Sequence, residues 1–178
     1  MTRSNRKVIE GEWKIFDQTP YLGTDVYGKT LGLIGLGLIG TAVAKRAKGF
    51  DMDILYHSRT RKPDAEKKYG LRWAPDLDEL LSSSDYISVH VPLGPETQGF
   101  IGSKEIKKMS KDAFLINTSR GGTVDPDALR DPLMPGQMYI FPFYVFSWDL
   151  LLQSGYLVHL DNIPCFSLTP HLSLSSPA

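Results

Sequence analysis

Short apolar runs alternate with amphipathic stretches along the first 130 residues of the chain. The apolar runs predict buried strands at residues 30–34, 53–57, 71–73, 86–91 and 113–117. The stretches between and after them predict helices at residues 38–49, 64–69, 76–81, 103–111 and 125–130. Strands that alternate with helices in this way predict an α/β fold with a parallel, doubly wound sheet of the Rossmann type and right-handed crossovers.

The helix predicted at residues 38–49 carries its apolar residues at a helical spacing. One face is predicted to consist of Ile39, Val43, Ala47 and Phe50, and the polar side of Thr41, Lys45 and Lys48. We expect the apolar face to pack against the sheet.

A glycine array, Gly35-x-Gly37-x-x-Gly40, joins the first predicted strand to this helix. The first glycine allows a tight turn, the second lets a pyrophosphate approach the backbone, and the third lets the helix pack close to the strand. Free N–H groups at the start of the helix favour an anion. The context of strand, turn and helix predicts a dinucleotide-binding unit, and a glycine-rich turn without a ligand is the alternative.

The second predicted strand ends in a basic segment, Ser58-Arg59-Thr60-Arg61-Lys62. An NAD site usually has an acidic residue here, which binds the ribose 2′-hydroxyl. This segment has no carboxylate to repel a 2′-phosphate, and a charge-assisted hydrogen bond is worth about 1.5–3 kcal/mol. We therefore predict NADP(H) in preference to NAD(H). The alternative is a solvated basic loop.

Composition narrows the class of protein. Lys and Arg together number 20, as do Asp and Glu, so no net charge points to nucleic acid or a membrane as a partner. The single cysteine, Cys165, excludes an internal disulfide. The first residues lack the apolar core of a secretory signal, so we expect a cytoplasmic protein. We also predict no metal site.

The composition changes sharply near Asp131. No Lys or Arg follows Arg130, no Glu follows Asp131, and aromatic residues and prolines are frequent from there on. We therefore predict an N-terminal arm at residues 1–28, a dinucleotide-binding domain at 29–131 and a divergent, irregular C-terminal segment at 132–178. The alternative for the C-terminal segment is a buried strand pair with an unusual surface. The carboxyl ends of parallel strands share one edge of a sheet, so we expect one crevice to be lined by Gly35, Ser58, Pro92 and Arg120.

Four ordered motifs resemble those of the D-isomer-specific 2-hydroxyacid dehydrogenases: YGKTLGLIGLGLIG, ILYHSRTRKP, DYISVHVPLGPETQGFI and FLINTSRGGTVDPDALRD. The SRTRK segment is most similar to the glyoxylate and hydroxypyruvate reductase branch. The resemblance implies reduction of a small 2-oxo acid by a nicotinamide cofactor. It also implies a two-domain enzyme, and we expect most of the substrate domain to be missing from this sequence.

The resemblance also implies roles for individual residues. Arg120 would bind the substrate carboxylate, because guanidinium matches a carboxylate with two parallel N–H groups, and His171 would deliver the proton. A lone histidine in a serine-rich tail is the alternative for His171. The resemblance further implies which residues contact each part of the cofactor. The pyrophosphate would lie on the backbone of Leu36, Gly37, Leu38 and Ile39, and the adenosine ribose with its phosphate would contact Ser58, Arg59 and Thr60. The adenine end would lie beside Val91 and Pro92, and the nicotinamide side beside Thr118 and Ser119.

Two departures from the family pattern bear on catalysis. Leu38 stands where the family usually has Arg or Lys, so one phosphate contact is lost, and Asp149 is the only acid near the expected position of the catalytic Glu. We therefore expect cofactor binding with weak or absent catalysis from this chain alone. A truncated, inactive NAD(P)-binding scaffold is the alternative to a reductase. The family generally forms dimers, and residues 13–27 are our candidate for a homodimer contact.

Overall fold

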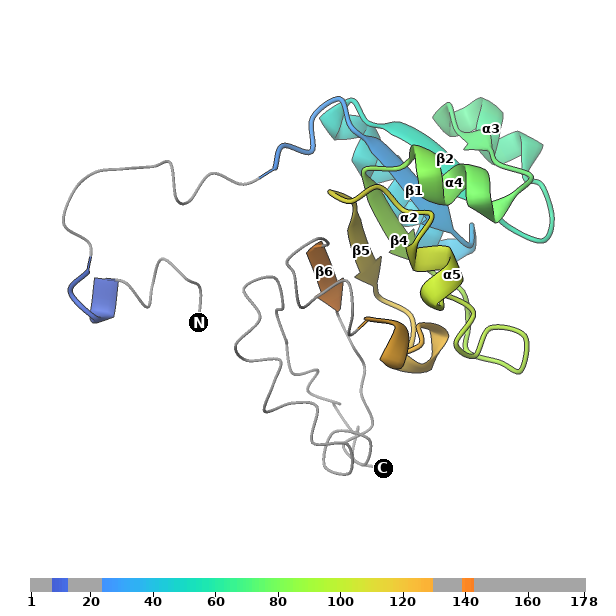
Figure 1. The fold of residues 1–178 in the computed structure, drawn as a ribbon. Helices are drawn as coiled ribbons and strands as arrows, with labels where there is room; N and C mark the ends of the chain where they lie inside the picture. The colour runs from blue at the N-terminus through green and yellow to red at the C-terminus, as the bar shows by residue number, and fades with distance from the viewer. Residues whose placement is uncertain (1–7, 13–23, 130–138, 143–178) are drawn as a thin grey trace, which may run out of the picture.

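The computed structural model describes residues 8–12, 24–129 and 139–142 (Figure 1). Its centre is a six-stranded, entirely parallel sheet in the order β3-β2-β1-β4-β5-β6. The strands are β1 (Thr30–Ile34), β2 (Asp53–His57), β3 (Arg72–Trp73), β4 (Tyr86–Val89), β5 (Phe114–Asn117) and β6 (Tyr139–Pro142). The order reverses between β1 and β4, and this switch point is where doubly wound sheets bind ligands.

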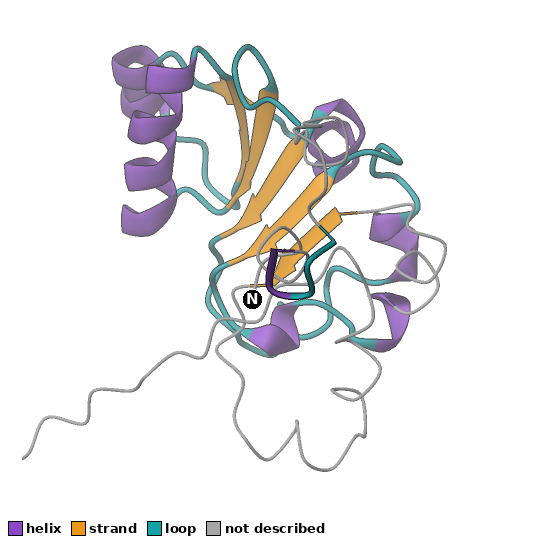
Figure 2. Ribbon diagram, turned by 90° about the vertical axis from the view of Figure 1, so that its left-hand side faces the viewer, coloured by secondary structure: helices purple, strands orange, loops and turns teal. Residues whose placement is uncertain are grey.

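Helices cover both faces of the sheet (Figure 2). One face packs against α2 (Leu38–Ala47) and α3 (Pro63–Tyr69), and the other against α4 (Leu77–Ser83) and α5 (Ser103–Ile106). Two separate apolar clusters result, one on each side of the sheet. Three 3₁₀ turns complete the described elements: η2 (Lys48–Phe50), η3 (Gly121–Thr123) and η4 (Asp127–Leu129). The predicted doubly wound parallel sheet is confirmed.

The sequence located the first two strands to the residue but overestimated several later elements. The helix predicted at 103–111 ends at Ile106, because the backbone then changes to i→i−3 hydrogen bonds, from the Lys108 and Met109 N–H groups to the Glu105 and Ile106 carbonyls. The helix predicted at 125–130 is only the 3₁₀ turn η4. The strand predicted at 86–91 ends at Val89.

The predicted buried face of α2 is partly wrong. Ile39 and Phe50 are 64% and 53% exposed, and the helix instead buries Gly40, Ala44 and Ala47. These three small residues follow an i, i+4, i+7 spacing. Close packing of this helix on the sheet selects small side chains and leaves the larger ones in solvent.

No helix among the described residues is long and apolar enough to cross a membrane.

Candidate functional site

The register of the sheet brings four chain segments to one edge. Ile34 at the end of β1 pairs with His57 of β2 on one side and with Val89 of β4 on the other, and Val89 pairs with Asn117 of β5. The residues that follow these strand ends therefore leave the sheet together at its carboxyl edge. All the predicted cofactor contacts, and Arg120, lie in these four segments.

The glycine turn after β1 has the geometry that its sequence predicts. Gly35 has a φ of +95°, a left-handed conformation that favours glycine, and its N–H donates to the His57 carbonyl at 2.8 Å. A Cβ on Gly40 would lie 2.3 Å from the Gly35 carbonyl oxygen, so only glycine fits there. The turn and the first turn of α2 are thus packed directly against each other.

The amino end of α2 presents free N–H groups to an open space. Gly37 is its N-cap, no side chain caps the helix, and no acidic residue lies in its first turn. A Cβ on Gly37 would meet nothing within 4 Å, and the neighbouring Leu36 side chain is buried in the core. The site therefore offers backbone N–H groups and a positive helix end, which fit the pyrophosphate of a dinucleotide. Leu38 is 94% exposed and supplies no charge.

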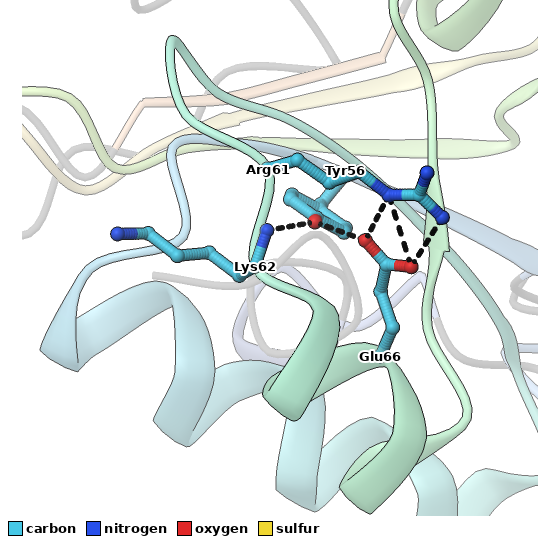
Figure 3. A network of polar contacts seen from close by, with 4 residues as sticks. All are labelled: Tyr56, Arg61, Lys62 and Glu66. Atoms are coloured by element: carbon cyan, nitrogen blue, oxygen red, sulfur yellow. Dashed lines mark hydrogen bonds and ion pairs between the residues drawn. The ribbon is translucent and has the colours of Figure 1, made fainter.

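The basic segment after β2 divides into two parts. Ser58 Oγ donates to the Thr60 carbonyl at 2.7 Å and closes a turn, and the Arg59 side chain is 90% exposed. Arg61, in contrast, forms an ion pair with Glu66 of α3, with 2.8 Å between Nη2 and Oε2 (Figure 3). Arg61 therefore offers no free charge to a ligand, because the carboxylate of Glu66, five residues along the chain, already holds it.

The segment after β4 packs beneath the glycine turn. A Cβ on Gly35 would lie 3.0 Å from both the His90 carbonyl oxygen and the Val91 side chain. His90 Nε2 lies 2.9 Å from Ser88 Oγ, and its Nδ1 lies 3.1 Å from Thr118 Oγ1. His90 therefore bridges the ends of β4 and β5, and it positions Thr118. Pro92 follows as an exposed residue at the same edge.

Burial lowers the pKa of His90 below its usual 6.5. The unfolded chain then binds a proton on His90 more readily than the folded chain, so stability is expected to fall as pH drops from 6.5 toward the folded pKa, and to be unaffected by this group above 6.5. Urea unfolding between pH 5 and 8 measures the effect. His90→Gln should flatten the slope, and an identical slope in this variant would contradict the assignment.

The turn after β5 is built around Asn117, whose side chain is 3% exposed. Its Nδ2 donates to the Arg120 carbonyl at 2.9 Å, and its Oδ1 accepts from the Ser119 N–H at 3.0 Å. Thr123 Oγ1, fully buried, also donates to the Arg120 carbonyl, at 2.7 Å. This framework leaves the Arg120 side chain exposed, with Nη1 donating to the Ser119 carbonyl at 2.8 Å.

Asn117→Ala is expected to lower the free energy of unfolding by about 2–3 kcal/mol, because it removes the acceptor of the Ser119 N–H and one donor to the Arg120 carbonyl, and leaves a cavity in place of a buried side chain. Ser119→Ala is the matched control, since it keeps the N–H that donates to Asn117 and removes only a half-buried hydroxyl, and its loss should be smaller. Urea unfolding compares the two. Equal stability of the Ala variant and the original chain would show that the framework contributes nothing.

Sequence reasoning missed His90, Asn117 and Thr123 as residues that shape the site. A signal existed for Asn117, because a polar residue that ends a buried apolar strand and precedes Thr-Ser-Arg is well placed to organise a turn. His90 and Thr123 gave no such signal, since their partners are 28 and 6 residues away in the chain and only the fold brings them together.

Several predicted residues lie outside the described part of the chain. They are His171, Asp149 and most of the candidate dimer segment at residues 13–27, of which only 24–27 are described. The structure therefore places Arg120 and all the predicted cofactor contacts, but it does not test the pairing of Arg120 with His171. Within residues 8–12, 24–129 and 139–142, no three His, Cys, Asp or Glu side chains gather as a metal site.

Comparison with protein families gives one match that covers nearly the whole chain. Residues 1–173 match the family described as D-isomer specific 2-hydroxyacid dehydrogenase, NAD binding domain. A glyoxylate reductase of Korarchaeum cryptofilum is 42% identical over 177 residues, which are 99% of this chain and 52% of the relative. A glyoxylate reductase of Thermococcus litoralis is 52% identical over 133 residues, which are 72% of this chain and 40% of the relative.

Solved structures agree with this result. The structure of D-lactate dehydrogenase with NAD⁺ from Lactobacillus jensenii is 31% identical, with a TM-score of 0.74 over 94% of this chain and 52% of that one. An acyclic imino acid reductase in complex with NADPH and D-Arg is 27% identical, with a TM-score of 0.78 over 94% of this chain and 50% of that one. The chain thus spans about half the length of these proteins, which include complexes with either nicotinamide cofactor.

Proposed function

The chain belongs to the D-isomer-specific 2-hydroxyacid dehydrogenase family, and on that premise we propose that it is the cofactor-binding part of an NADP(H)-dependent reductase of a small 2-oxo acid. Glyoxylate and hydroxypyruvate are the substrates we favour, because the relatives named glyoxylate reductase and glyoxylate/hydroxypyruvate reductase B are 39–52% identical over the matched residues. We also propose that the dinucleotide-binding domain spans residues 29–131.

The observation that carries the proposal is the uncapped amino end of α2 beside the open space at Gly37. The backbone of residues 36–39 would hold the pyrophosphate there, because N–H groups and the helix dipole both favour an anion. The segments after β4 and β5 would hold the adenine end and the nicotinamide side, through Val91 and Pro92 and through Thr118 and Ser119. When bound, the cofactor supplies the hydride for the reaction.

Arg120 would bind the carboxylate of the 2-oxo acid and polarise its carbonyl group. Its guanidinium is exposed at the carboxyl edge of the sheet, and the framework around Asn117 fixes its backbone. Two parallel N–H groups match a carboxylate in a way that lysine cannot. His171 would then be the proton donor, since imidazole titrates near neutral pH. We also propose a homodimer, as the resemblance to the family implies, and a cytoplasmic location.

A preference for NADP(H) follows from the end of β2. Residues 58–62 include no Asp or Glu that would repel a 2′-phosphate, and Ser58 and Arg59 lie directly after the strand. Arg59 carries an exposed charge, and its ion-pair partner Glu96 is 3.6 Å away and itself largely exposed. Such a pair is worth about 0–1 kcal/mol, so a phosphate competes with it easily.

A nucleotide-binding scaffold without catalysis is the second candidate. The observation that favours it is the absence of any Glu after Glu105, where the family has a catalytic Glu. Loss of a positioned acid–base group lowers a rate by about 10²–10⁴-fold. The two candidates share the cofactor site and differ in turnover.

Titration of the purified chain with NADPH, beside NADPH oxidation with glyoxylate and hydroxypyruvate, tests the proposal. We expect saturable NADPH binding with slow turnover. Arg120→Ala should abolish that turnover and change NADPH affinity by less than about threefold, and Arg120→Lys should recover little, because it lacks the planar fork. Binding without any turnover would favour the scaffold, and binding of neither nucleotide would refute both.

Leu38→Arg is expected to tighten NADPH binding by about three- to tenfold, because it adds a charged donor at the amino end of α2 where the helix binds phosphate. The side chain is almost fully exposed, so the fold should tolerate the change. Leu38→Gln is the uncharged control. Equal affinities of the Arg and Gln variants in fluorescence titration would show that no phosphate lies at this helix end.

A further inference from the structure

The two arginines of the segment after β2, Arg59 and Arg61, are held in different ways, although only Thr60 stands between them. Arg61 Nε donates to Glu66 Oε1 at 2.9 Å, and Arg61 Nη2 donates to Glu66 Oε2 at 2.8 Å. Both oxygens of the carboxylate are therefore engaged by one guanidinium. This two-point geometry is the strongest that an Arg–carboxylate pair adopts.

Other contacts anchor the same pair to the sheet. The Arg61 guanidinium carbon lies 5.3 Å from the centre of the Trp73 ring, on β3. Tyr56 Oη, from the fully buried Tyr56 of β2, donates to Glu66 Oε1 at 2.6 Å. Burial, and then the bond to Glu66, raises the pKa of Tyr56, so its hydroxyl remains a donor at neutral pH. The Glu66 side chain is only 15% exposed.

The segment itself is tied back to the strand that it leaves. The Lys62 N–H donates to Tyr56 Oη at 2.7 Å (Figure 3). Tyr56 thus precedes residues 57–61 in the chain and also binds the residue that follows them, which closes the segment into a loop. The Lys62 side chain points away from the Arg61–Glu66 pair (Figure 3). Hydrogen bonds from Arg61, and then from Tyr56, lower the pKa of Glu66, so the carboxylate keeps its charge as this loop forms.

Arg59 occupies the tip of the closed loop. Its side chain is 90% exposed, and its contact with Glu96, at 3.6 Å, is with a residue 82% exposed. The loop also begins next to the glycine turn, because the His57 carbonyl accepts the Gly35 N–H. The fold thus presents the exposed cation of Arg59 beside the candidate cofactor site and pairs the cation of Arg61 with a carboxylate.

We propose that Arg61 is a positioning residue and not a phosphate ligand: with Tyr56 and Glu66 it fixes the loop so that Arg59 meets the 2′-phosphate of NADP(H). This inference rests on the proposed function, because it assigns cofactor selectivity within the same site.

A second consequence concerns the charge of Glu66. Removing Arg61 alone leaves that carboxylate without its guanidinium partner near the loop, which repels a phosphate and weakens NADPH binding even though Arg61 never touches it. Glu66→Gln instead keeps both arginines and removes the negative charge. It releases Arg61, so NADPH binding should tighten or stay the same if Arg61 is a ligand, and should weaken if Arg61 acts only by holding the loop.

Four purified variants distinguish these cases: Arg59→Ala, Arg61→Ala, Glu66→Gln and Tyr56→Phe. NADPH and NADH affinities are measured for each by fluorescence titration, and the quantity compared is the ratio of the two dissociation constants. We expect Arg59→Ala to reduce the preference for NADPH by about ten- to a hundredfold with NADH binding unchanged. Glu66→Gln and Tyr56→Phe keep both arginines, and we expect each to reduce the preference for NADPH by about three- to tenfold because the loop that carries Arg59 opens.

A preference for NADPH that is unchanged or greater in Glu66→Gln and Tyr56→Phe but falls in Arg61→Ala would overturn the inference, because Arg61 would then act as a ligand and not through the loop. The original chain separates this failure from failure of the proposed function. Should it bind neither nucleotide, the proposed function fails and the ligand role of Arg59 fails with it. Should it bind both, the ratios decide the inference alone.

Limited trypsin digestion tests the positioning role without any nucleotide. The bonds after Arg59 and Arg61 are trypsin sites within the closed loop, whereas Pro63 blocks cleavage after Lys62. We expect Tyr56→Phe and Glu66→Gln each to accelerate cleavage in the loop by about tenfold, because local opening exposes these bonds. Lys62→Ala, which keeps the backbone N–H, is the control. Unchanged cleavage in both variants would show that the network does not hold the loop.

Discussion

Gly37→Ala is expected to weaken NADPH binding by about thirtyfold, because a methyl group would occupy the position at which a pyrophosphate approaches the backbone. The protein itself has room for the change, since a Cβ there meets nothing within 4 Å and the φ of −85° suits any residue. Stability should therefore change by less than about 1 kcal/mol, with a weaker N-cap offset by a stiffer unfolded chain. Fluorescence titration and urea unfolding measure the two effects separately.

Gly49→Ala is the matched control for this experiment. Gly49 also has open space around it, but it lies in η2, beyond the carboxyl end of α2 and away from the candidate site. It should change neither affinity nor stability appreciably. If Gly37→Ala binds NADPH as tightly as Gly49→Ala does, the pyrophosphate does not rest on this helix end.

Gly40→Ala is expected to lower the free energy of unfolding by on the order of 3 kcal/mol, because its Cβ would lie 2.3 Å from the Gly35 carbonyl oxygen. That oxygen belongs to the backbone of the glycine turn and can move only if the turn moves with it. Relief requires α2 to shift from β1, and that shift moves the amino end of the helix. Binding of NADPH and NADH should therefore weaken together. This pattern differs from that of Arg59→Ala, which should affect NADPH alone.

Urea unfolding of Gly40→Ala, again beside Gly49→Ala, measures the stability change. Nucleotide titration below the unfolding transition then reports affinity in folded protein only. A Gly40→Ala chain as stable as the original would contradict the close packing of the glycine turn against the helix.

The central part of the fold was predictable because local patterns and tertiary packing agree there. The runs at 30–34 and 53–57 are apolar enough to be buried on both faces of a sheet, and β1 and β2 have these bounds. The glycine array marked the turn between them, and Gly35 adopts the left-handed conformation that the pattern requires. The carboxyl-edge position of the cofactor segments then followed from parallel topology alone.

The buried face of α2 was predicted less well, because periodicity counts apolar residues without regard to size. Ile39 and Phe50 fit the helical spacing but lie in solvent, and the helix buries Gly40, Ala44 and Ala47. How close a helix packs depends on the partner surface, which one segment of sequence does not encode. The same limit explains the short α5, whose last predicted residues leave the helix to bury Met109.

Side-chain pairing was the least predictable level. From the sequence alone, the three cationic side chains of residues 58–62 cannot be told apart. The placement of α3 shows that Glu66 holds Arg61 while Arg59 stays exposed. Similarly, the bridge from Ser88 through His90 to Thr118 joins two strands. Such pairs depend on distances between elements, which follow from the whole packed structure.

Fluorescence titration of the purified chain with NADPH and NADH shows whether the carboxyl edge of this sheet binds a nicotinamide nucleotide. We expect saturable binding of NADPH, with NADH weaker by about tenfold or more because it lacks the 2′-phosphate that Arg59 is proposed to meet. Failure of both nucleotides to saturate the protein would contradict the assignment of this site.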